Sequence, residues 1–73
     1  ERAKFVDLMI FFENNLGFTL AKTGENSLKR FMKKLPIDEI MESIEIASSR
    51  EFPDYDSQFK YFCGICHNKI RSL

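Results

Sequence analysis

The sequence predicts an all-α domain, a compact bundle of four, or at most five, helices. Apolar residues recur at helical spacing in four segments, glycine or proline residues separate most of these segments, and no segment alternates with period two for long enough to form a strand. The chain has 73 residues, 44% of them hydrophobic and eight of them phenylalanine. It is near the lower size limit for a core without disulfides or metals, but aromatic residues bury a large area each. Because residues 1–73 start at Glu1 rather than at methionine, we expect a single domain excised from a longer chain.

The first predicted helix covers residues 2–16. Its apolar residues fall within one stripe at helical spacing: Phe5, Leu8, Met9, Phe12 and Leu16. Gly17 follows at the position where glycine commonly ends a helix in the left-handed conformation. The helix is therefore expected to end at Leu16.

The second predicted helix runs from about residue 20 to residue 34, with Thr19 as a candidate N-cap. Its inner face holds Leu20, Gly24, Leu28, Phe31 and Leu35, and its outer face holds Lys29, Arg30, Lys33 and Lys34. Within the helix, Gly24 would lower helix stability by about 1 kcal/mol relative to alanine. Alternatively, it marks a later helix start near Thr23 or a close crossing with another helix.

The third predicted helix follows Pro36, which lacks an N–H that would be unpaired in a first turn anyway. It ends near Ser49, and its buried stripe comprises Ile37, Ile40, Met41, Ile44 and Ala47. Residues 50–56 include Pro53 and form a connector with room for one short turn.

The last predicted helix is capped by Asp54, Asp56 or Ser57 and runs to about Arg71. On a helical wheel, five residues lie within about 60° of Phe59 and form an apolar stripe with it: Phe62, Cys63, Cys66, Ile70 and Leu73. We expect this stripe to complete an aromatic core.

The net charge is zero, but the charges are segregated. Basic residues dominate residues 22–35 and 57–73, and acidic residues dominate residues 36–56. A basic patch attracts polyanions even when the total charge is zero. No segment approaches the roughly 20 apolar residues of a membrane span, and no secretory signal appears. Two cysteines cannot build the disulfide framework of a secreted mini-protein, so we expect a cytoplasmic protein with no membrane partner.

The stretch Cys63-Gly64-Ile65-Cys66-His67 has the spacing of a c-type haem attachment site, and its two cysteines also fit a redox dithiol or half a zinc site. A zinc site needs four ligands, and His67 is the only histidine. A redox dithiol places its first cysteine at a helix N-terminus, whereas Cys63 comes about two turns into this helix. Because both cysteines lie on the apolar stripe, we interpret them as core residues and expect no cofactor. A haem or redox protein is the least favoured alternative.

Catalysis is not expected. One histidine, without a glycine-rich phosphate loop or a spaced carboxylate pair, provides no set of nucleophile, base and orienting group. The sequence therefore predicts a protein that is not an enzyme.

Three stretches resemble the DnaD-like domain of bacterial and phage replication-initiation proteins. Residues 11–17, Phe-Phe-Glu-Asn-Asn-Leu-Gly, are similar to the opening motif of that family, and residues 40–47, Ile-Met-Glu-Ser-Ile-Glu-Ile-Ala, are similar to its third helix. Residues 59–69 are similar to its final motif, Tyr-x-x-x-Ile-x-x-x-Trp. Two departures are plain: Lys69 replaces the usual Trp, and Ser43 replaces a small apolar residue.

The resemblance implies a non-enzymatic helical domain that binds DNA and acts in primosome assembly. The expected partners are single- or double-stranded DNA and the replicative helicase or its loader. Homo-oligomerisation would involve regions outside this sequence. The tail that follows the last helix in this family is implicated in DNA binding.

The last helix also carries residues suited to DNA contact. Lys60, Gly64, His67 and Arg71 align away from the apolar stripe, where two cations and an open glycine would meet a phosphate backbone. Tyr61 and Ile65 form a separate ridge beside Asn68, and an exposed tyrosine there could stack on an unpaired base. The predicted DNA-binding residues are Lys60, Tyr61, Gly64, Ile65, His67, Asn68, Lys69 and Arg71.

Other interpretations stay open at this point. The basic face of the second helix is another candidate for DNA contact, and each of these faces could instead be ordinary solvated surface. The main alternative function is a docking module for a helicase or loader without DNA contact. It would use the acidic third helix or the ridge of Tyr61 and Ile65.

Overall fold

The computed structural model describes residues 2–73, with side chains from residue 4 onward, and within that part every regular element is a helix. The elements are α1 (Arg2–Leu16), α2 (Lys22–Lys34), α3 (Ile37–Ser48) and α4 (Tyr55–Arg71). The all-α prediction is confirmed with four helices, and the connector between α3 and α4 adds no fifth. Within the described residues, no helix combines the length and the apolar character needed to cross a membrane.

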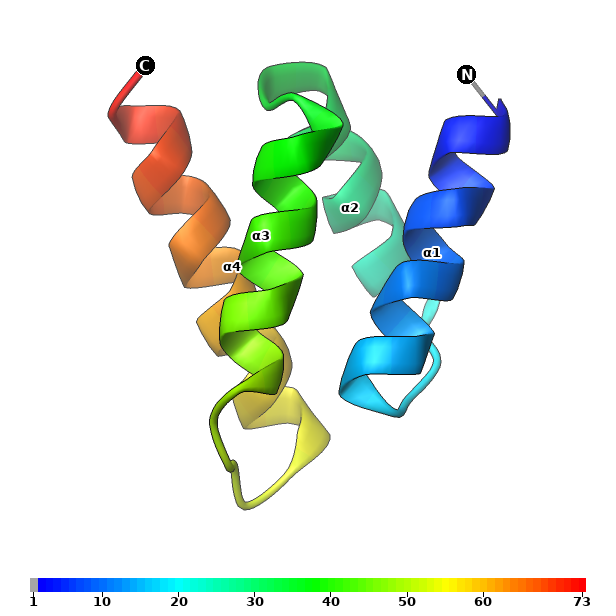
Figure 1. Cartoon of the computed structure of the whole chain (residues 1–73), viewed down its shortest axis with the longest axis vertical. Coiled ribbons are helices and arrows are strands. Elements are labelled where there is room, and N and C mark those ends of the chain that lie inside the picture. The colour runs from blue at the N-terminus through cyan, green and yellow to red at the C-terminus, as the bar shows by residue number, and fades with distance from the viewer. Residues whose placement is uncertain (1) are drawn as a thin grey trace.

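The helices alternate in direction. Helices α1 and α3 run one way and α2 and α4 the other, with α3 between α1 and α4 and with α2 behind (Figure 1). Helix α3 packs along both α1 and α4, and α2 packs against α3 and α4. Because α2 and α4 run in the same direction, their C-terminal halves lie at the same end of the bundle, together with the α2–α3 connection and both ends of the described chain (Figure 1).

Phenylalanine rings form the centre of the bundle. Phe62 of α4 lies 5.5 Å from Phe12 and 5.9 Å from Phe31 between ring centroids, both edge to face. Such pairs add to the free energy gained by burial alone. Phe12 and Phe62 are completely buried, as are Leu8, Leu28, Ile40 and Ile44.

The predicted apolar stripes are buried or half-buried with one exception. Leu73 is 81% exposed, so its assignment to the core was wrong. Helix α4 ends at Arg71 with Ser72 as its C-cap, and Leu73 therefore lies beyond the last turn that packs on the bundle.

Local chemistry explains most helix ends. Gly17 has φ of +81° and ends α1 in the left-handed conformation, as predicted. At the start of α4, Asp54 is the cap: its Oδ1 accepts a hydrogen bond from the Ser57 backbone N–H at 2.7 Å. That hydrogen bond holds the pKa of Asp54 below its ordinary value.

Thr19 is not the N-cap of α2, and this prediction was wrong. The helix begins at Lys22, with Ala21 in the cap position and without a side-chain cap. Leu20 precedes the helix but is still buried. A Cβ atom at Gly24 would lie 2.8 Å from Leu20 Cδ2 and 3.5 Å from the Phe59 ring, so the glycine permits close packing at this late helix start.

Candidate nucleic-acid interface

The two thiols of α4 are embedded in the fold rather than presented for chemistry. Cys66 is completely buried and Cys63 is half-buried at the edge of the core. Desolvation raises the pKa of each thiol to about 11, so neither is a thiolate at neutral pH. Within the described residues, no three His, Cys, Asp or Glu side chains lie close enough together to hold a metal ion.

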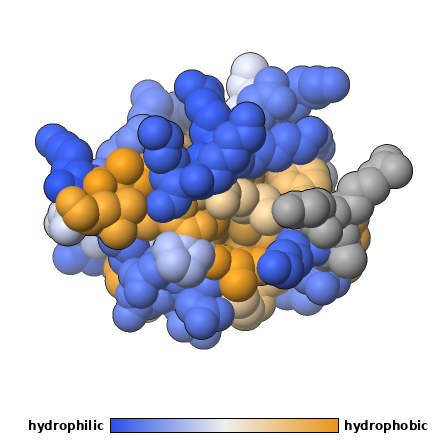
Figure 2. Space-filling view, turned by 90° about the horizontal axis from the view of Figure 1, so that it is seen from above, coloured by the Kyte–Doolittle hydropathy of each residue, from blue (hydrophilic) through white to orange (hydrophobic). Residues whose placement is uncertain are grey.

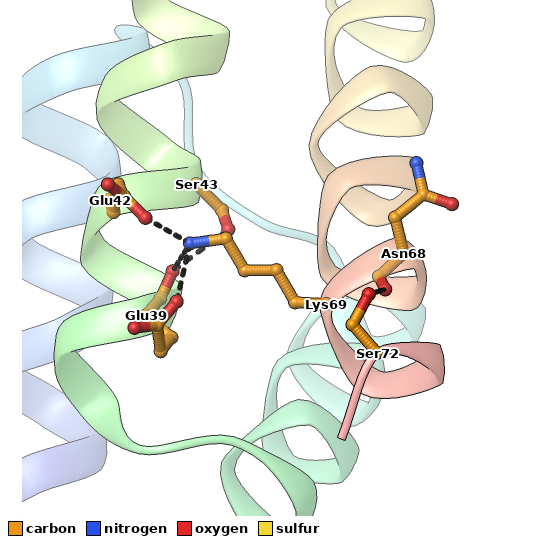
Figure 3. Close-up of polar contacts among 6 residues, drawn as sticks. All are labelled: Glu39, Glu42, Ser43, Asn68, Lys69 and Ser72. Carbon is orange, nitrogen blue, oxygen red and sulfur yellow. Dashed lines mark hydrogen bonds and ion pairs between the residues drawn. The ribbon is translucent and has the colours of Figure 1, made fainter.

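Lys69 was predicted to contact DNA, but its side chain extends from α4 to α3 (Figure 3). Its Nζ donates to Glu39 Oε1 at 2.8 Å, to the Glu39 carbonyl oxygen at 3.1 Å, and to Glu42 Oε1. The side chain is only 19% exposed. Desolvation opposes its charge, but hydrogen bonds and charge attraction from both glutamates outweigh that effect and raise the pKa of Lys69.

The structure gives Lys69 a role in joining α4 to α3, and its contact with DNA stays a prediction. Helices α3 and α4 run antiparallel, so the end of α4 lies beside the start of α3, where Glu39 and Glu42 are one turn apart (Figure 1). Two carboxylates then neutralise the ammonium. Asn68, the preceding residue, is exposed and points away from this bridge (Figure 3). Its Oδ1 accepts a hydrogen bond from Arg71 Nη2 at 2.9 Å.

The Tyr61 ring packs against side chains outside α4. Its ring centroid lies 5.3 Å from that of Phe52, and the Arg50 guanidinium lies 5.2 Å from the Tyr61 centroid. Both neighbours belong to the connector before α4. Tyr61 and Ile65 are both half-buried, so the expected ridge is only partly exposed, and Tyr61 packs against that connector.

The remaining predicted residues lie on the surface of α4. Lys60, Gly64, His67 and Arg71 are all exposed, as the wheel predicted. Lys60 forms an ion pair with Asp56 at 3.2 Å in which both side chains are about three-quarters exposed, so water screens the pair. No atom lies within 4 Å of a Cβ built at Gly64, so packing does not require glycine there.

His67 connects this surface to α2. Its ring lies edge-on to Phe31 of α2, with 5.2 Å between ring centroids. Beside it, α2 and α4 enclose a cavity of about 300 Å³. The floor consists of Phe31, Cys63 and Ile70, and the rim consists of Ser27, Arg30, Lys33, Lys34 and His67.

We call this surface the α2–α4 groove. No carboxylate lines it, so its rim is entirely cationic or neutral. Among residues 4–73, no acidic side chain forms an ion pair with Arg30, Lys33 or Lys34, whereas Lys69 has two such partners. The groove therefore presents charge that a polyanion can neutralise.

Sequence reasoning found both halves of this groove but did not join them. The outer face of α2 and the surface of α4 were separate candidates, because helical periodicity does not indicate which helices are neighbours. The available signal was the alternating helix direction, which places Arg30 and Lys34 at the same end of the bundle as His67 (Figure 1).

Comparison of the chain with protein-family models, curated proteins and solved structures finds no match.

Proposed function

We propose that this chain is a non-enzymatic DNA-binding domain that acts in replication initiation and primosome assembly. Its phosphate contacts come from the α2–α4 groove and the adjoining surface of α4. The observation that carries the proposal is the junction of Arg30, Lys33 and Lys34 with His67 around one groove that has no carboxylate in its lining. The choice of DNA and of replication rests on the resemblance to DnaD-like domains.

The chemistry of the groove favours contact with the phosphate backbone over reading of bases. Lysine and arginine side chains on a helix surface are mobile, and they gain affinity by releasing counterions from the nucleic acid. Contacts to phosphates position a protein without selecting a sequence. Binding is therefore expected to be weak, sensitive to salt and largely independent of sequence.

The alternative, a docking module without DNA contact, was expected to use α3 or the ridge of Tyr61 and Ile65. Glu39 and Glu42 of α3 are already engaged with Lys69, and Phe52 and Arg50 cover Tyr61. These contacts reduce what either surface offers to a helicase or loader. They weaken the case for docking at those two surfaces.

The test is a fluorescence anisotropy titration with labelled single-stranded and duplex oligonucleotides at two salt concentrations. We expect saturable binding at low salt and a slope of log affinity against log salt of about −0.9 for each duplex phosphate neutralised. Arg30→Ala with Lys34→Ala should weaken binding and reduce that slope by up to about 2. If neither the single-stranded nor the duplex oligonucleotide binds at low salt, the docking module is favoured instead.

A further inference from the structure

A second hollow lies on the other side of α2, where the start of α1 meets the end of α2 and the beginning of α3. Its volume is about 700 Å³. We call it the α1–α2–α3 groove. The view down this end of the bundle shows apolar surface exposed between hydrophilic side chains (Figure 2). This groove is separate from the DNA groove proposed above, and the two share Lys33 alone among their lining residues.

The floor of this groove is apolar and partly open to water. Phe5, Met32 and Ile37 are half-buried members of the core periphery, and Val6 beside them is 51% exposed. Methionine is flexible and polarisable, so it adapts to apolar side chains of different shapes. A hollow with such a floor suits inserted apolar side chains.

The rim of the groove is cationic. Lys4 comes from α1, and Lys29 and Lys33 come from successive turns of α2, while no carboxylate lines the groove. Lys29 Nζ lies 5.1 Å from the centroid of the Phe5 ring, a contact with an aromatic face rather than with an acid. The complementary ligand therefore carries negative charge beside an apolar face.

We propose that the α1–α2–α3 groove binds an acidic amphipathic helix of a partner protein. Its apolar residues would insert over Phe5, Met32 and Ile37, and its glutamates or aspartates would pair with Lys4, Lys29 and Lys33. This is the helix-in-groove mode, in which apolar anchors at i, i+3, i+4 and i+7 enter a preformed hollow. The cations beside the apolar floor restrict how an acidic helix can be oriented.

The shape and charge of this groove favour a partner protein as its occupant over a second copy of this chain and over a lipid surface. A second copy would have to present an acidic face, and the obvious one, α3, already uses Glu39 and Glu42 to hold Lys69 of its own chain. A lipid surface is contacted by apolar residues that protrude, whereas here the apolar residues line a hollow.

The probe is a synthetic peptide of about 18 residues, long enough to form a helix, with leucine at the anchor spacing and glutamate on the flanks. One control replaces each glutamate by lysine and another scrambles the order. We expect saturable binding of the glutamate peptide at low salt, with NMR shifts at the Met32 and Ile37 methyl groups. Equal binding of the lysine peptide, or no binding of the glutamate peptide, would overturn the proposal.

Two matched variants separate this groove from the DNA groove on the same helix. Lys4→Glu with Lys29→Glu should weaken peptide binding about tenfold or more, because like charges then face one another. Arg30→Glu with Lys34→Glu should leave peptide affinity within about twofold, since these residues face the other groove. Equal loss in both variants would mean that only general charge attracts the peptide, and would overturn the proposal.

Two further measurements, made on the wild-type chain and on both variants, test whether a second copy or a lipid surface occupies the groove. Sedimentation velocity without peptide should show a monomer, and a dimer that dissociates in the Lys4→Glu, Lys29→Glu variant would assign the groove to a second copy. Vesicles containing phosphatidylserine should bind both variants equally or not at all. Vesicle binding lost only in the Lys4→Glu, Lys29→Glu variant would assign the groove to a lipid surface instead.

Discussion

The two sides of helix α4 carry basic residues at the same level of the bundle, yet the two surroundings differ. On the side that faces α3, Lys69 is 19% exposed and bound by two glutamates. On the side that faces α2, His67 is exposed and stands beside Arg30 and Lys34, with no carboxylate in the lining. On the α3 side the cation joins two helices, and on the α2 side the cations have no acidic partner in the groove lining. A basic residue indicates a polyanion site only when neighbouring helices leave its charge unpaired.

The largest effect on stability is expected at Phe62, whose ring lies in the core between the two sides of α4. Phe62 contacts the rings of Phe12, Phe31 and Phe59 and is completely buried. Phe62→Ala should lower the free energy of unfolding by about 3–5 kcal/mol through lost burial and a cavity. Urea denaturation followed by circular dichroism measures this loss. Phe62→Leu, which retains most of the volume, should cost clearly less, and equal costs would contradict the described packing.

The second prediction compares the two sides through their cysteines. Because the pKa of each thiol is raised from an ordinary 9.0 to about 11, the thiolate fraction below pH 9 is about a hundredfold lower than in free cysteine. Cys63 borders the α2–α4 groove, whereas Cys66 is completely buried. We expect slow alkylation of both, with Cys63 modified first. Mass spectrometry of the single Cys→Ser variants gives the order, and faster reaction of Cys66 would contradict the assignment.

A smaller effect is expected at the Lys69 bridge. Lys69→Met keeps the apolar stem but leaves two glutamates without their cation, and should cost about 1–2 kcal/mol of unfolding free energy. A double-mutant cycle with Glu42→Gln measures the coupling. No measurable coupling would show that the bridge contributes nothing to stability.

The same bridge predicts a dependence on pH. The pKa of Lys69 is raised above its ordinary 10.5 in the folded state, so its stabilisation is fully present below about that pH and is lost as pH rises through the folded value. Denaturation curves of the wild-type chain should therefore approach those of Lys69→Met in strongly alkaline buffer. A difference that stays constant with pH would contradict the ionic origin.

The smallest effect is expected at Lys60. Its exposed ion pair with Asp56 already offsets part of its charge. Lys60→Ala should therefore weaken DNA binding by no more than about twofold. Asp56→Asn, the matched control, removes the acid and should strengthen binding by a similar factor. A tenfold loss on Lys60→Ala would move the centre of the interface toward the start of α4.

Helical periodicity predicted most of the fold because each helix buries one apolar stripe, and signals such as Gly17 and Asp54 mark some of the helix ends. The bounds of α1 agree with the prediction, and Asp54 caps α4 as one of the three candidates. The start of α2 was missed because no side chain caps it and Leu20 is buried outside the helix. Leu73 was missed because a wheel extends a stripe past the residue at which packing stops.

The candidate site was harder to predict because it depends on which helix lies beside which. A wheel correctly separated Lys60, His67 and Arg71 from the apolar stripe. A wheel could not show that Lys69 would form ion pairs with Glu39 and Glu42, or that Phe52 of the connector would pack against Tyr61. The first contact joins residues far apart in the sequence, and the second involves an irregular connector. Helical periodicity carries no information about either kind of contact.

The most direct test of the difference between the two sides is the affinity of one labelled DNA duplex for two variants at the same low salt concentration. Arg30→Glu with Lys34→Glu changes the α2 side, and Lys69→Met changes the α3 side; circular dichroism verifies that both are folded. The first variant should bind about tenfold more weakly or worse, with unchanged unfolding free energy, and the second should bind within about twofold of wild type. Wild-type affinity in the first variant, or an equal loss in the second, would contradict the account.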